Sequence, residues 1–389
     1  MKRRRANIHA PEAVVVACDL ITPYGWGIDA CWNGLLSGKT AINPLDRFDT
    51  EVFQTKKAAV ITELKTGQSD SLVMQMLKPL LKKASAIIPK DALLILATTT
   101  GEIDILEKQV LNTKGNADES APGCLLSKVQ CLSGIKSPGI IISAACTSSS
   151  SAIAQASAMI RSKEHDCALI VACDIVSEFV FAGFSSLMAL DKDTAQPFDK
   201  DRSGLSLGEA AGFVLVMSKE RALQEKRFII GEIAGWGLTN DANHMTGPSR
   251  DGDGLALAMR KAMQSANISK DTVGCIAAHG TGTMYNDAME MKAFKSIFTS
   301  EAVPTYSIKG GIGHTMGAAG LVEVVVALQS LRKKLVPPTV NLRVADNEAE
   351  GWVSNEQCEF DSPITISINA GFGGVNSALV LKKWDEQQL

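Results

Sequence analysis

Several features are absent from this chain of 389 residues, and each absence excludes a class of protein. No apolar run approaches the roughly 20 residues of a membrane span, so we expect none. The formal net charge is −3, which gives no reason to expect nucleic-acid binding through bulk charge. Short repeats and low-complexity segments are also missing, and 46% hydrophobic with 21% charged residues is a soluble globular composition.

Cysteine pairs of the kind found in redox or zinc motifs are missing too. The nine cysteines are scattered, with no CxxC pair and no Cys/His ligand spacing. An odd count in a large chain indicates free thiols in a reducing compartment. We therefore expect a cytoplasmic protein without structural zinc.

The N-terminus imitates a signal peptide. It begins with the basic stretch MKRRR, but the apolar run 13–18 is short and is stopped by Asp19. We predict a disordered basic tail followed by a first strand.

Apolar runs alternate with helical patterns along the chain. The runs are short and aliphatic, which is typical of strands buried on both faces. We predict strands at 13–18, 92–97, 139–143, 167–172, 212–217, 228–233, 275–278, 364–369 and 378–381. We predict helices at 72–84, 149–162, 254–266, 288–298 and 318–333. This alternation predicts an α/β fold with mixed or parallel sheets.

The length suggests two packed halves, and a coarse duplication supports this division. Each half opens with a strand that leads into a Gly-rich or Thr-rich turn. Each also holds a helix of small residues, one beginning near Cys146 and the other near Ala318. We place the boundary near Trp236, which gives halves of residues 1–235 and 236–389.

Cys146 lies where an apolar run turns into a helical pattern, in the stretch SAACTSSSSAIAQASAMI. A thiol at such a turn faces the free N–H groups of the helix, whose dipole favours a thiolate and lowers the pKa. The alternative is a buried, inert cysteine. We assign that role to Cys18, Cys173 and Cys275, which lie inside or at the edges of apolar runs.

Two of the five histidines lie in loops suited to catalysis. His279 ends the apolar run 275–278 and precedes a Gly/Thr loop, and catalytic groups collect at the carboxyl ends of strands. Lys309 and His314 are separated by glycines in SIKGGIGHTMGAAG. A phosphate-binding loop is the alternative for these glycines, but Lys309 precedes them, unlike the order GxxxxGK[ST].

The segment NAGFGGVNSALVL predicts a tight turn between two strands. N–H groups of such a turn can point at one spot and build an oxyanion hole, although an ordinary glycine hairpin is the alternative. One cysteine with two histidines is not a protease set, which needs one histidine with an Asn or Asp. Two histidines suit another task, since both can donate hydrogen bonds to one carbonyl oxygen.

Six ordered motifs carry a resemblance to a known family: AACTSSSSAIAQA, QPFDKDRSGLSLGEAAGFVLV, NDANHMTGP, HGTGTMYNDAMEM, KGGIGHTMGAAG and NAGFGGVNSALVL. The chain resembles the β-ketoacyl-acyl carrier protein synthases of the decarboxylating Cys-His-His class. These are the elongating condensing enzymes of type II fatty acid and polyketide synthesis. The resemblance runs from residue 13 to 382 and implies a thiolase-like fold, with two similar α/β halves in a five-layer αβαβα stack.

The resemblance implies a decarboxylative Claisen condensation of an acyl thioester on Cys146 with malonyl-acyl carrier protein. His279 and His314 would bind the malonyl thioester carbonyl and stabilise the enolate left after loss of CO2. The backbone N–H groups of Cys146 and Phe372 would form the oxyanion hole. Lys309 would order the two histidines.

Further roles follow from the same resemblance. Glu290 and Glu323 would support the site, the latter paired with Lys309. Thr281 and Thr283 match threonines that contact the phosphopantetheine arm. Phe184 matches a phenylalanine that gates the acyl pocket.

The resemblance also implies partners. No free cofactor or catalytic metal is needed, because phosphopantetheine arrives on the acyl carrier protein. The chain would form a homodimer, or a heterodimer with a ketosynthase-like paralogue, with strands near Cys146 pairing across the interface. Basic residues that we expect to dock the acidic carrier protein are Lys56, Lys57, Lys78, Lys82 and Lys83.

Two alternatives stay open at this point. A thiolase-type coenzyme A acyltransferase normally has a Cys-His pair and a second cysteine near the C-terminus, but GFGGVN holds no cysteine. A non-catalytic carrier-binding partner subunit would not need the complete set of Cys146, His279, Lys309 and His314. Both alternatives are therefore disfavoured.

Overall fold

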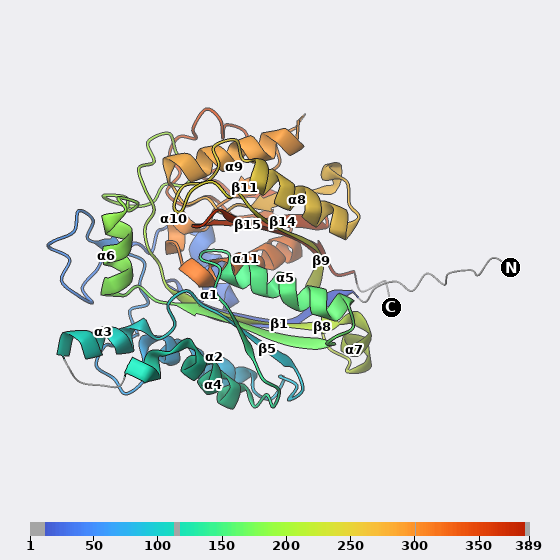
Figure 1. Cartoon of the computed structure of the whole chain (residues 1–389). Helices are drawn as coiled ribbons and strands as arrows, with labels where there is room; N and C mark the ends of the chain where they lie inside the picture. Colours follow the sequence, from blue (N-terminus) through green and yellow to red (C-terminus); the bar gives the residue numbers. More distant parts are fainter. Residues whose placement is uncertain (1–11, 113–116, 300, 386–389) are drawn as a thin grey trace.

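The structure, a computed structural model, describes residues 12–112, 117–299 and 301–385 (Figure 1). The predicted basic tail lies almost entirely outside these residues. No helix in the described part is long and apolar enough to cross a membrane.

The strands form two stacked layers that join at one edge. The join is the short antiparallel pairing of β1 with β9, at Val14 with Glu232 and Val15 with Gly231. Pairing is antiparallel between β1 and β8 and between β7 and β8, and parallel between β7 and β5 and between β5 and β6, so the predicted mixed sheet is confirmed. The first layer holds β1 (Ala13–Thr22), β2 (Gly25–Trp26), β5 (Leu93–Ala97), β6 (Ile140–Ile142), β7 (Cys167–Asp174) and β8 (Ala210–Ser218). The second holds β9 (Gly231–Asn240), β10 (Cys275–Ala277), β11 (Thr305–Tyr306), β14 (Ile364–Gly371) and β15 (Val375–Lys383).

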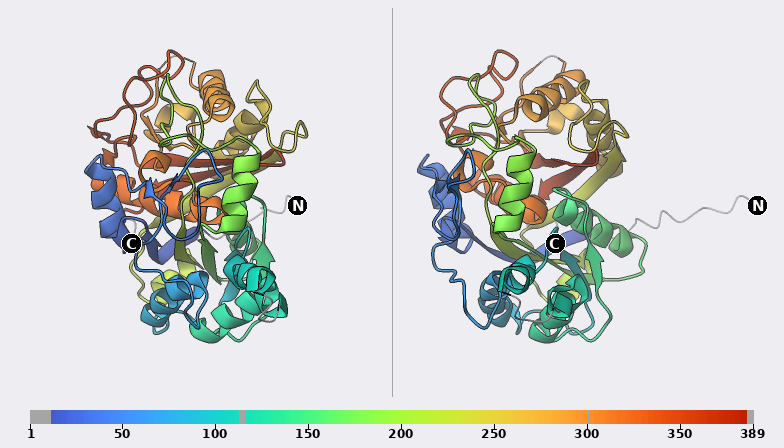
Figure 2. Two further views of the ribbon diagram at one scale, coloured as in Figure 1. Left: turned by 90° about the vertical axis from the view of Figure 1, so that its left-hand side faces the viewer. Right: turned by 60° about the vertical axis from the view of Figure 1, so that its left-hand side comes forward.

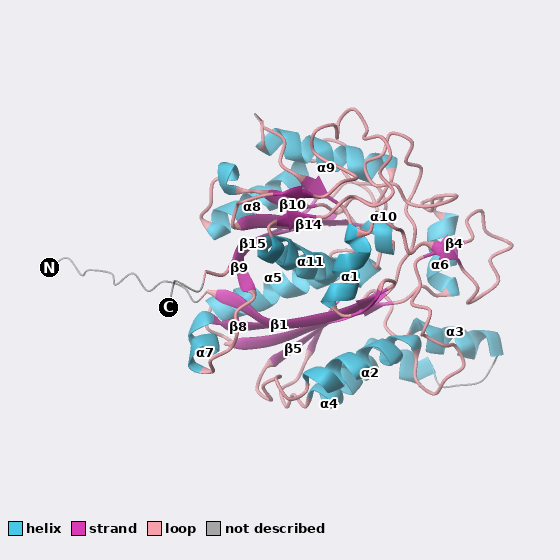
Figure 3. Ribbon diagram, turned by 180° about the vertical axis from the view of Figure 1, so that it is seen from behind, coloured by secondary structure: helices cyan, strands magenta, loops and turns pink. Residues whose placement is uncertain are grey.

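Helices cover both outer faces and fill the space between the sheets, as Figures 1 and 3 show. The first sheet is covered by α2 (Leu72–Ala84) and α4 (Pro122–Ser133), and the second by α8 (Asp253–Ala266) and α9 (Met284–Ile297). Between the sheets lie α5 (Ser148–Arg161) and α11 (Ala319–Lys333). The predicted five-layer αβαβα stack is therefore confirmed.

The remaining elements are short or peripheral. The helices are α1 (Ile28–Leu36), α3 (Ile103–Asn112), α6 (Glu178–Ser186), α7 (Lys219–Gln224) and α10 (Lys309–Ile312). Single 3-10 turns are η1 (Ala117–Ser120), η2 (Lys270–Thr272) and η3 (Met316–Ala318). Two small hairpins pair β3 (Asn43–Pro44) with β4 (Lys57–Ala58) and β12 (Leu335–Val336) with β13 (Cys358–Glu359).

Strand β9 begins three residues later and runs seven residues further than predicted. It contains three glycines, Gly231, Gly235 and Gly237, and glycine disfavours a strand from propensity alone. The structure shows why glycine is needed there: a Cβ on Gly237 would lie 1.9 Å from the Ala258 carbonyl oxygen of α8, and one on Gly235 would lie 2.3 Å from that of Ala262. The predicted boundary at residue 236 falls inside this strand, and the division into halves stays a prediction.

The two central helices meet at their N-termini, which positions the site. A Cβ on Gly320 of α11 would lie 2.7 Å from the backbone nitrogen of Ser150 on α5. The backbone N–H of Leu321 donates to Ser149 Oγ at 2.9 Å. This close approach brings the loop before α11 against the turn before α5.

Candidate active site

Cys146 lies on the sharp turn between β6 and α5, as predicted. The preceding residue, Ala145, has φ of +48°, a left-handed conformation that is strained for a residue with a Cβ. Hydroxyl groups brace the turn: Thr147 Oγ1 donates to the Ala144 carbonyl at 2.7 Å, and Ser148 Oγ donates to the Ala145 carbonyl at 2.6 Å. The run of hydroxyl residues after the thiol therefore holds its backbone.

The thiol of Cys146 is buried, with 7% of the residue exposed. Burial raises its pKa to about 11, although the Lys309 charge and hydrogen bonds from the backbone N–H groups of Phe372 and Cys146 act in the opposite direction. The prediction that the helix N-terminus lowers this pKa is wrong, because desolvation of the thiolate outweighs the dipole. The two N–H groups nevertheless converge at the sulfur, as an oxyanion hole requires.

His279 and His314 converge on the same sulfur. The Cys146 Sγ and one ring nitrogen of each histidine all lie within 4.8 Å of one another. The imidazole rings are 5.2 Å apart and nearly perpendicular. A zinc ion could use these three ligand types, but the Lys309 ammonium beside His279 opposes a cation there.

Hydrogen bonds define the protonation of both imidazoles. The backbone N–H of Met316 donates to His314 Nδ1 at 3.0 Å, and Lys309 Nζ lies 3.2 Å from His279 Nδ1. Burial, followed by the Lys309 charge, holds the pKa of both histidines well below the usual range. Both rings are therefore neutral, with Nδ1 accepting and Nε2–H left as the donor.

Lys309 is buried, and hydrogen bonds to residues from other parts of the chain fix the position of its ammonium group. Its Nζ pairs with Glu323 of α11 and also donates to the His279 carbonyl. Asn369 of β14 donates to the other oxygen of Glu323. Removal from water raises the pKa of Glu323, while Lys309 opposes that shift. The predicted pairing of these two residues is thus present in the structure.

Glu290 of α9 supports the loop that carries His279. Its carboxylate accepts from the backbone N–H of His279 at 2.9 Å and of Gly280 at 2.7 Å. Burial, followed by the charge of Asp287, raises the pKa of Glu290 to about 8. Sequence analysis missed Asp287, although it lies three residues before Glu290 and so on the same face of α9.

The two threonines lie in the loop before α9, and Thr283 is the residue directly before the helix. Thr281 is buried, and its backbone N–H donates to Asp287 Oδ1 at 3.0 Å. The hydroxyl oxygens of Thr281 and Thr283 are 2.9 Å apart. Asp287 therefore shapes the Gly/Thr loop in the way that Glu290 shapes the residues before it.

Asp174 is a second residue that sequence analysis missed. It ends β7 and is fully buried. Its carboxylate accepts from Thr98 Oγ1 at 2.8 Å, from Thr99 Oγ1 at 2.8 Å and from the backbone N–H of Gly317 at 2.7 Å. It thereby joins the end of β5 to the loop that follows His314. The sequence feature that could have identified Asp174 is its position at the end of an apolar strand, where functional groups collect in α/β folds.

An apolar chamber of about 390 Å³ opens beside the thiol. Phe184 of α6 stacks on Phe372 of the GFGG turn, with ring centroids 5.6 Å apart and planes at 27°. The chamber is lined by Thr99, Thr100, Met316 and residues of α6. The predicted tight turn between two strands is confirmed, since β14 and β15 pair through Gly371 and Val375.

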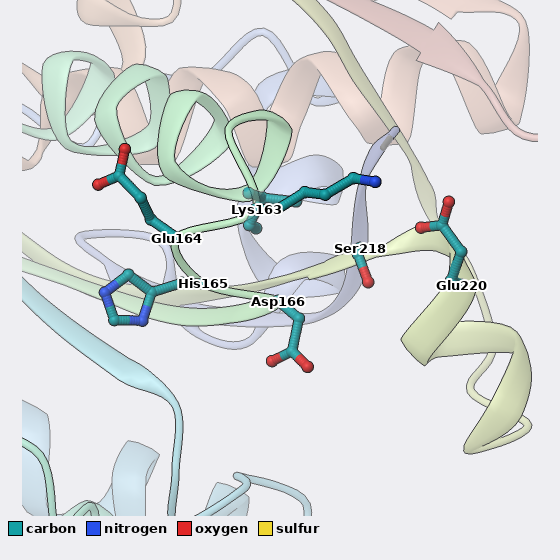
Figure 4. Close-up of a pocket in the computed structure, with 7 residues that line it drawn as sticks. Lys163, Glu164, His165, Asp166, Ser218 and Glu220 are labelled. Carbon is teal, nitrogen blue, oxygen red and sulfur yellow. The ribbon is translucent and has the colours of Figure 1, made fainter. Parts of the chain in front are cut away.

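A second hollow, of about 490 Å³, lies at the other end of α5 (Figure 4). Its charged side chains come from the segment between α5 and β7 and from the start of α7. No cysteine lines it, and neither His279 nor His314 is among its lining residues.

The basic residues expected to dock a carrier protein are mostly ion-paired. Lys83 contacts Asp19 at 2.9 Å and Lys56 contacts Glu51 at 2.7 Å. Lys78 and Lys57 pair with Asp70 and Asp193. Their charges are therefore partly neutralised within the chain.

Comparison with known proteins agrees with this geometry. Residues 97–222 match the family model of the β-ketoacyl synthase N-terminal domain, and residues 230–343 match that of the C-terminal domain. The chain is 31% identical to 3-oxoacyl-[acyl-carrier-protein] synthase 2 of Vibrio harveyi, over 96% of this chain and 98% of the relative. The same enzyme of Vibrio cholerae is 30% identical, over 96% and 99%. Among solved structures, the ishigamide ketosynthase/chain length factor matches with a TM-score of 0.86 and 28% identity, over 97% of this chain and all of that one. The chain therefore belongs to the β-ketoacyl synthase family.

Proposed function

We propose that the chain condenses an acyl group held on Cys146 with a malonyl unit carried by acyl carrier protein. The products are 3-oxoacyl-acyl carrier protein and CO2, as well as the carrier protein freed in the loading step. The observation that carries this proposal is the convergence of a thiol and two neutral imidazoles within 4.8 Å in one buried site.

In the loading step, Cys146 Sγ attacks the carbonyl of an acyl-carrier thioester. The new bond joins Sγ to the acyl carbon, the thioester bond to the carrier breaks, and the thiol proton passes to the departing carrier sulfur. The backbone N–H groups of Cys146 and Phe372 supply the donors for the oxyanion.

In the condensing step, the malonyl thioester carbonyl lies between the two histidines. The bond between the malonyl α-carbon and its carboxylate breaks and CO2 leaves, while Nε2–H of His279 and of His314 stabilise the enolate oxygen. Neutral imidazoles suit this task because they donate a hydrogen bond without a competing proton transfer. The enolate carbon then attacks the acyl carbon, the bond to Sγ breaks, and the thiolate takes up a proton.

Other residues hold these groups in place. Lys309 orients His279 through Nδ1 and is itself neutralised by Glu323. Glu290 fixes the backbone at His279. We assign Thr281 and Thr283 to the phosphopantetheine arm, and Phe184 to the gate of the acyl chamber, where it stacks on Phe372.

A second copy or a ketosynthase-like paralogue completes the enzyme in this proposal. Strand β6 ends the first sheet, and Ile140 on it is 37% exposed, which supports pairing along this edge. Phosphopantetheine arrives on the carrier, so no free cofactor is required. We place the enzyme in the cytoplasm, and we assign the nucleophile to residues 1–235 and the two histidines to residues 236–389.

The test supplies the purified protein with acyl- and malonyl-acyl carrier protein. We expect CO2 release together with a product two carbons longer, detected by mass spectrometry on the carrier. Absence of CO2 release from the wild-type protein would overturn the proposal. Condensation of coenzyme A thioesters without any carrier protein would favour the thiolase-type alternative.

A further inference from the structure

Helix α6 presents one side to the chamber beside Cys146. Phe179, Gly183 and Leu187 lie at intervals of four residues, and Val180 and Phe184 form a second row on the same side. This light-green helix stands at the left-hand side of Figure 1 and comes to the front of the molecule in both views of Figure 2. The side chains on this face therefore set the width of the chamber.

Gly183 is the one position in these rows that contributes no side chain. A Cβ added there would meet no atom within 4 Å. Its φ is not left-handed, so the backbone does not require glycine either. Glycine inside a helix destabilises it relative to alanine. Neither packing nor backbone conformation requires glycine here, and the residue lies on the lining of the chamber, where a larger side chain would take up room.

The contrast with other glycines of the site supports this reading. A Cβ on Gly208 would lie 2.0 Å from the Ile312 carbonyl oxygen, and one on Gly280 would lie 2.5 Å from Ser307 Cβ. Those positions accept only glycine because another part of the chain fills the space. At Gly183, which is exposed, no other part of the chain fills the space, and the residue lies where the chamber opens to the surface.

We propose that Gly183 is a specificity-determining residue, whose missing side chain admits long aliphatic or unsaturated acyl chains along α6. The assignment of the chamber to an acyl group rests on the proposed function. The lining contains no charged side chain and only hydroxyl groups as polar ones, namely Thr99, Thr100 and Ser186. An apolar chain attached at Sγ passes the stacked rings of Phe184 and Phe372 and continues past Gly183.

The test measures which lengths of alkyl chain the chamber admits, and it does not require the condensation reaction. Cys146 is alkylated with N-alkyl bromoacetamides of increasing length, from butyl to hexadecyl, in wild type, Gly183→Val and Gly183→Phe. In each reaction a bond forms between Sγ and the acetamide carbon, bromide leaves, and the thiol proton passes to the buffer. Intact-protein mass spectrometry follows the rate, and peptide mapping confirms Cys146 as the site. The hexadecyl rate is divided by the butyl rate of the same variant.

We expect this ratio to fall at least tenfold in Gly183→Phe and by a smaller factor in Gly183→Val. The matched control is Gly123→Phe in α4, where an added Cβ also meets nothing within 4 Å and which does not line the chamber. Its ratio should equal that of wild type. An unchanged ratio in folded Gly183→Phe, or in Gly183→Val if the Phe variant does not fold, overturns the proposal, as does an equal fall in Gly123→Phe.

The two proposals fail separately. If wild type releases no CO2 from malonyl-acyl carrier protein but the alkylation ratio still depends on residue 183, the condensation is wrong, whereas the effect of residue 183 on the length of chain that the chamber admits holds. If wild type condenses normally and the alkylation ratio does not change with the residue at position 183, only the role proposed for Gly183 is wrong.

Discussion

The two hollows at the ends of helix α5 differ in the chemistry of their lining residues, and their volumes do not predict which one holds the candidate active site. The hollow at its C-terminal end is the larger, at about 490 Å³, and it is lined by Lys163, Glu164, His165 and Asp166 (Figure 4). The chamber at its N-terminal end measures about 390 Å³ and contains Cys146 among apolar residues. Size alone would favour the wrong hollow.

The physical difference lies in what water can reach. In the outer hollow, Asp166 is 63% exposed at its side chain and pairs with Arg221 at 2.7 Å, so its charge is solvated. At the chamber, His279, His314 and Lys309 are all buried; the Lys309 charge lowers the pKa of both histidines, and His314 lowers that of His279. Charges act strongly on one another only where water is excluded. Dryness and convergence therefore distinguish a reactive site from a surface depression.

The largest expected effect is that of Cys146→Ala. Loss of the nucleophile should reduce condensation by about 10⁶-fold, as for the nucleophile of a serine protease. Decarboxylation of malonyl-acyl carrier protein should persist, because both histidines remain. Product and CO2 are measured separately, with Cys131→Ala as the control because that cysteine is exposed. Normal condensation by Cys146→Ala would refute the nucleophile assignment.

Removal of the imidazole of His279 or of His314 ranks second. His314→Ala or His279→Ala should slow decarboxylation by about 10²–10³-fold, the usual cost of losing one donor to a developing oxyanion. His165→Ala in the outer hollow provides the matched control and should leave the rate unchanged. An equal loss of decarboxylation rate in His165→Ala and His314→Ala would contradict the conclusion that only the hollow beside Cys146 is the active site.

The pH dependence of Cys146 alkylation should show a smaller but graded effect. The thiolate is the reactive form, and burial raises the thiol pKa to about 11. Between pH 7 and 10 the rate with iodoacetamide should therefore rise by about tenfold per pH unit, because the thiolate fraction grows with pH below the pKa. A plateau that begins near pH 8 would show that the site stabilises the thiolate more than burial disfavours it.

The smallest expected effects concern stability. Glu323→Ala leaves the buried Lys309 cation without its partner, and we expect a loss of about 3–5 kcal/mol in the free energy of unfolding. Glu164→Ala in the outer hollow should change it by less than about 0.5 kcal/mol. Denaturant unfolding of both variants measures the difference. Similar losses of unfolding free energy in the two variants would contradict the claim that the charges near Cys146 are shielded from water and those of the outer hollow are solvated.

Local pattern predicted most elements because their packing agrees with their periodicity. Helix α2 has the predicted limits of 72 and 84, since its buried residues repeat at helical spacing and Ser71 caps it by accepting from the N–H of Met74. Strand β9 was misplaced because the reason for its glycines is the approach of α8, which lies about twenty residues away in the sequence. Contacts of this kind leave no periodic signal.

The candidate site residues were predictable from the order of the motifs, but some of their properties were not. The sequence places Cys146 at a helix start, and the dipole argument alone predicts a low pKa. The fold buries the thiol, and the loss of water raises its pKa, against that prediction. Asp174 and Asp287 were missed because their roles depend on backbone N–H groups that only the tertiary structure brings to them.

The sequence by itself determined the alternation of strands and helices, the family, and the choice of Cys146, His279 and His314 as candidate site residues, since these follow from local patterns and from ordered motifs. Only the tertiary structure decided the charge state of these groups, the buried pairing that holds Lys309, and the empty space beside Gly183. Those properties depend on which distant segments exclude water from one another, and desolvation is a property of the packed chain rather than of any stretch of it.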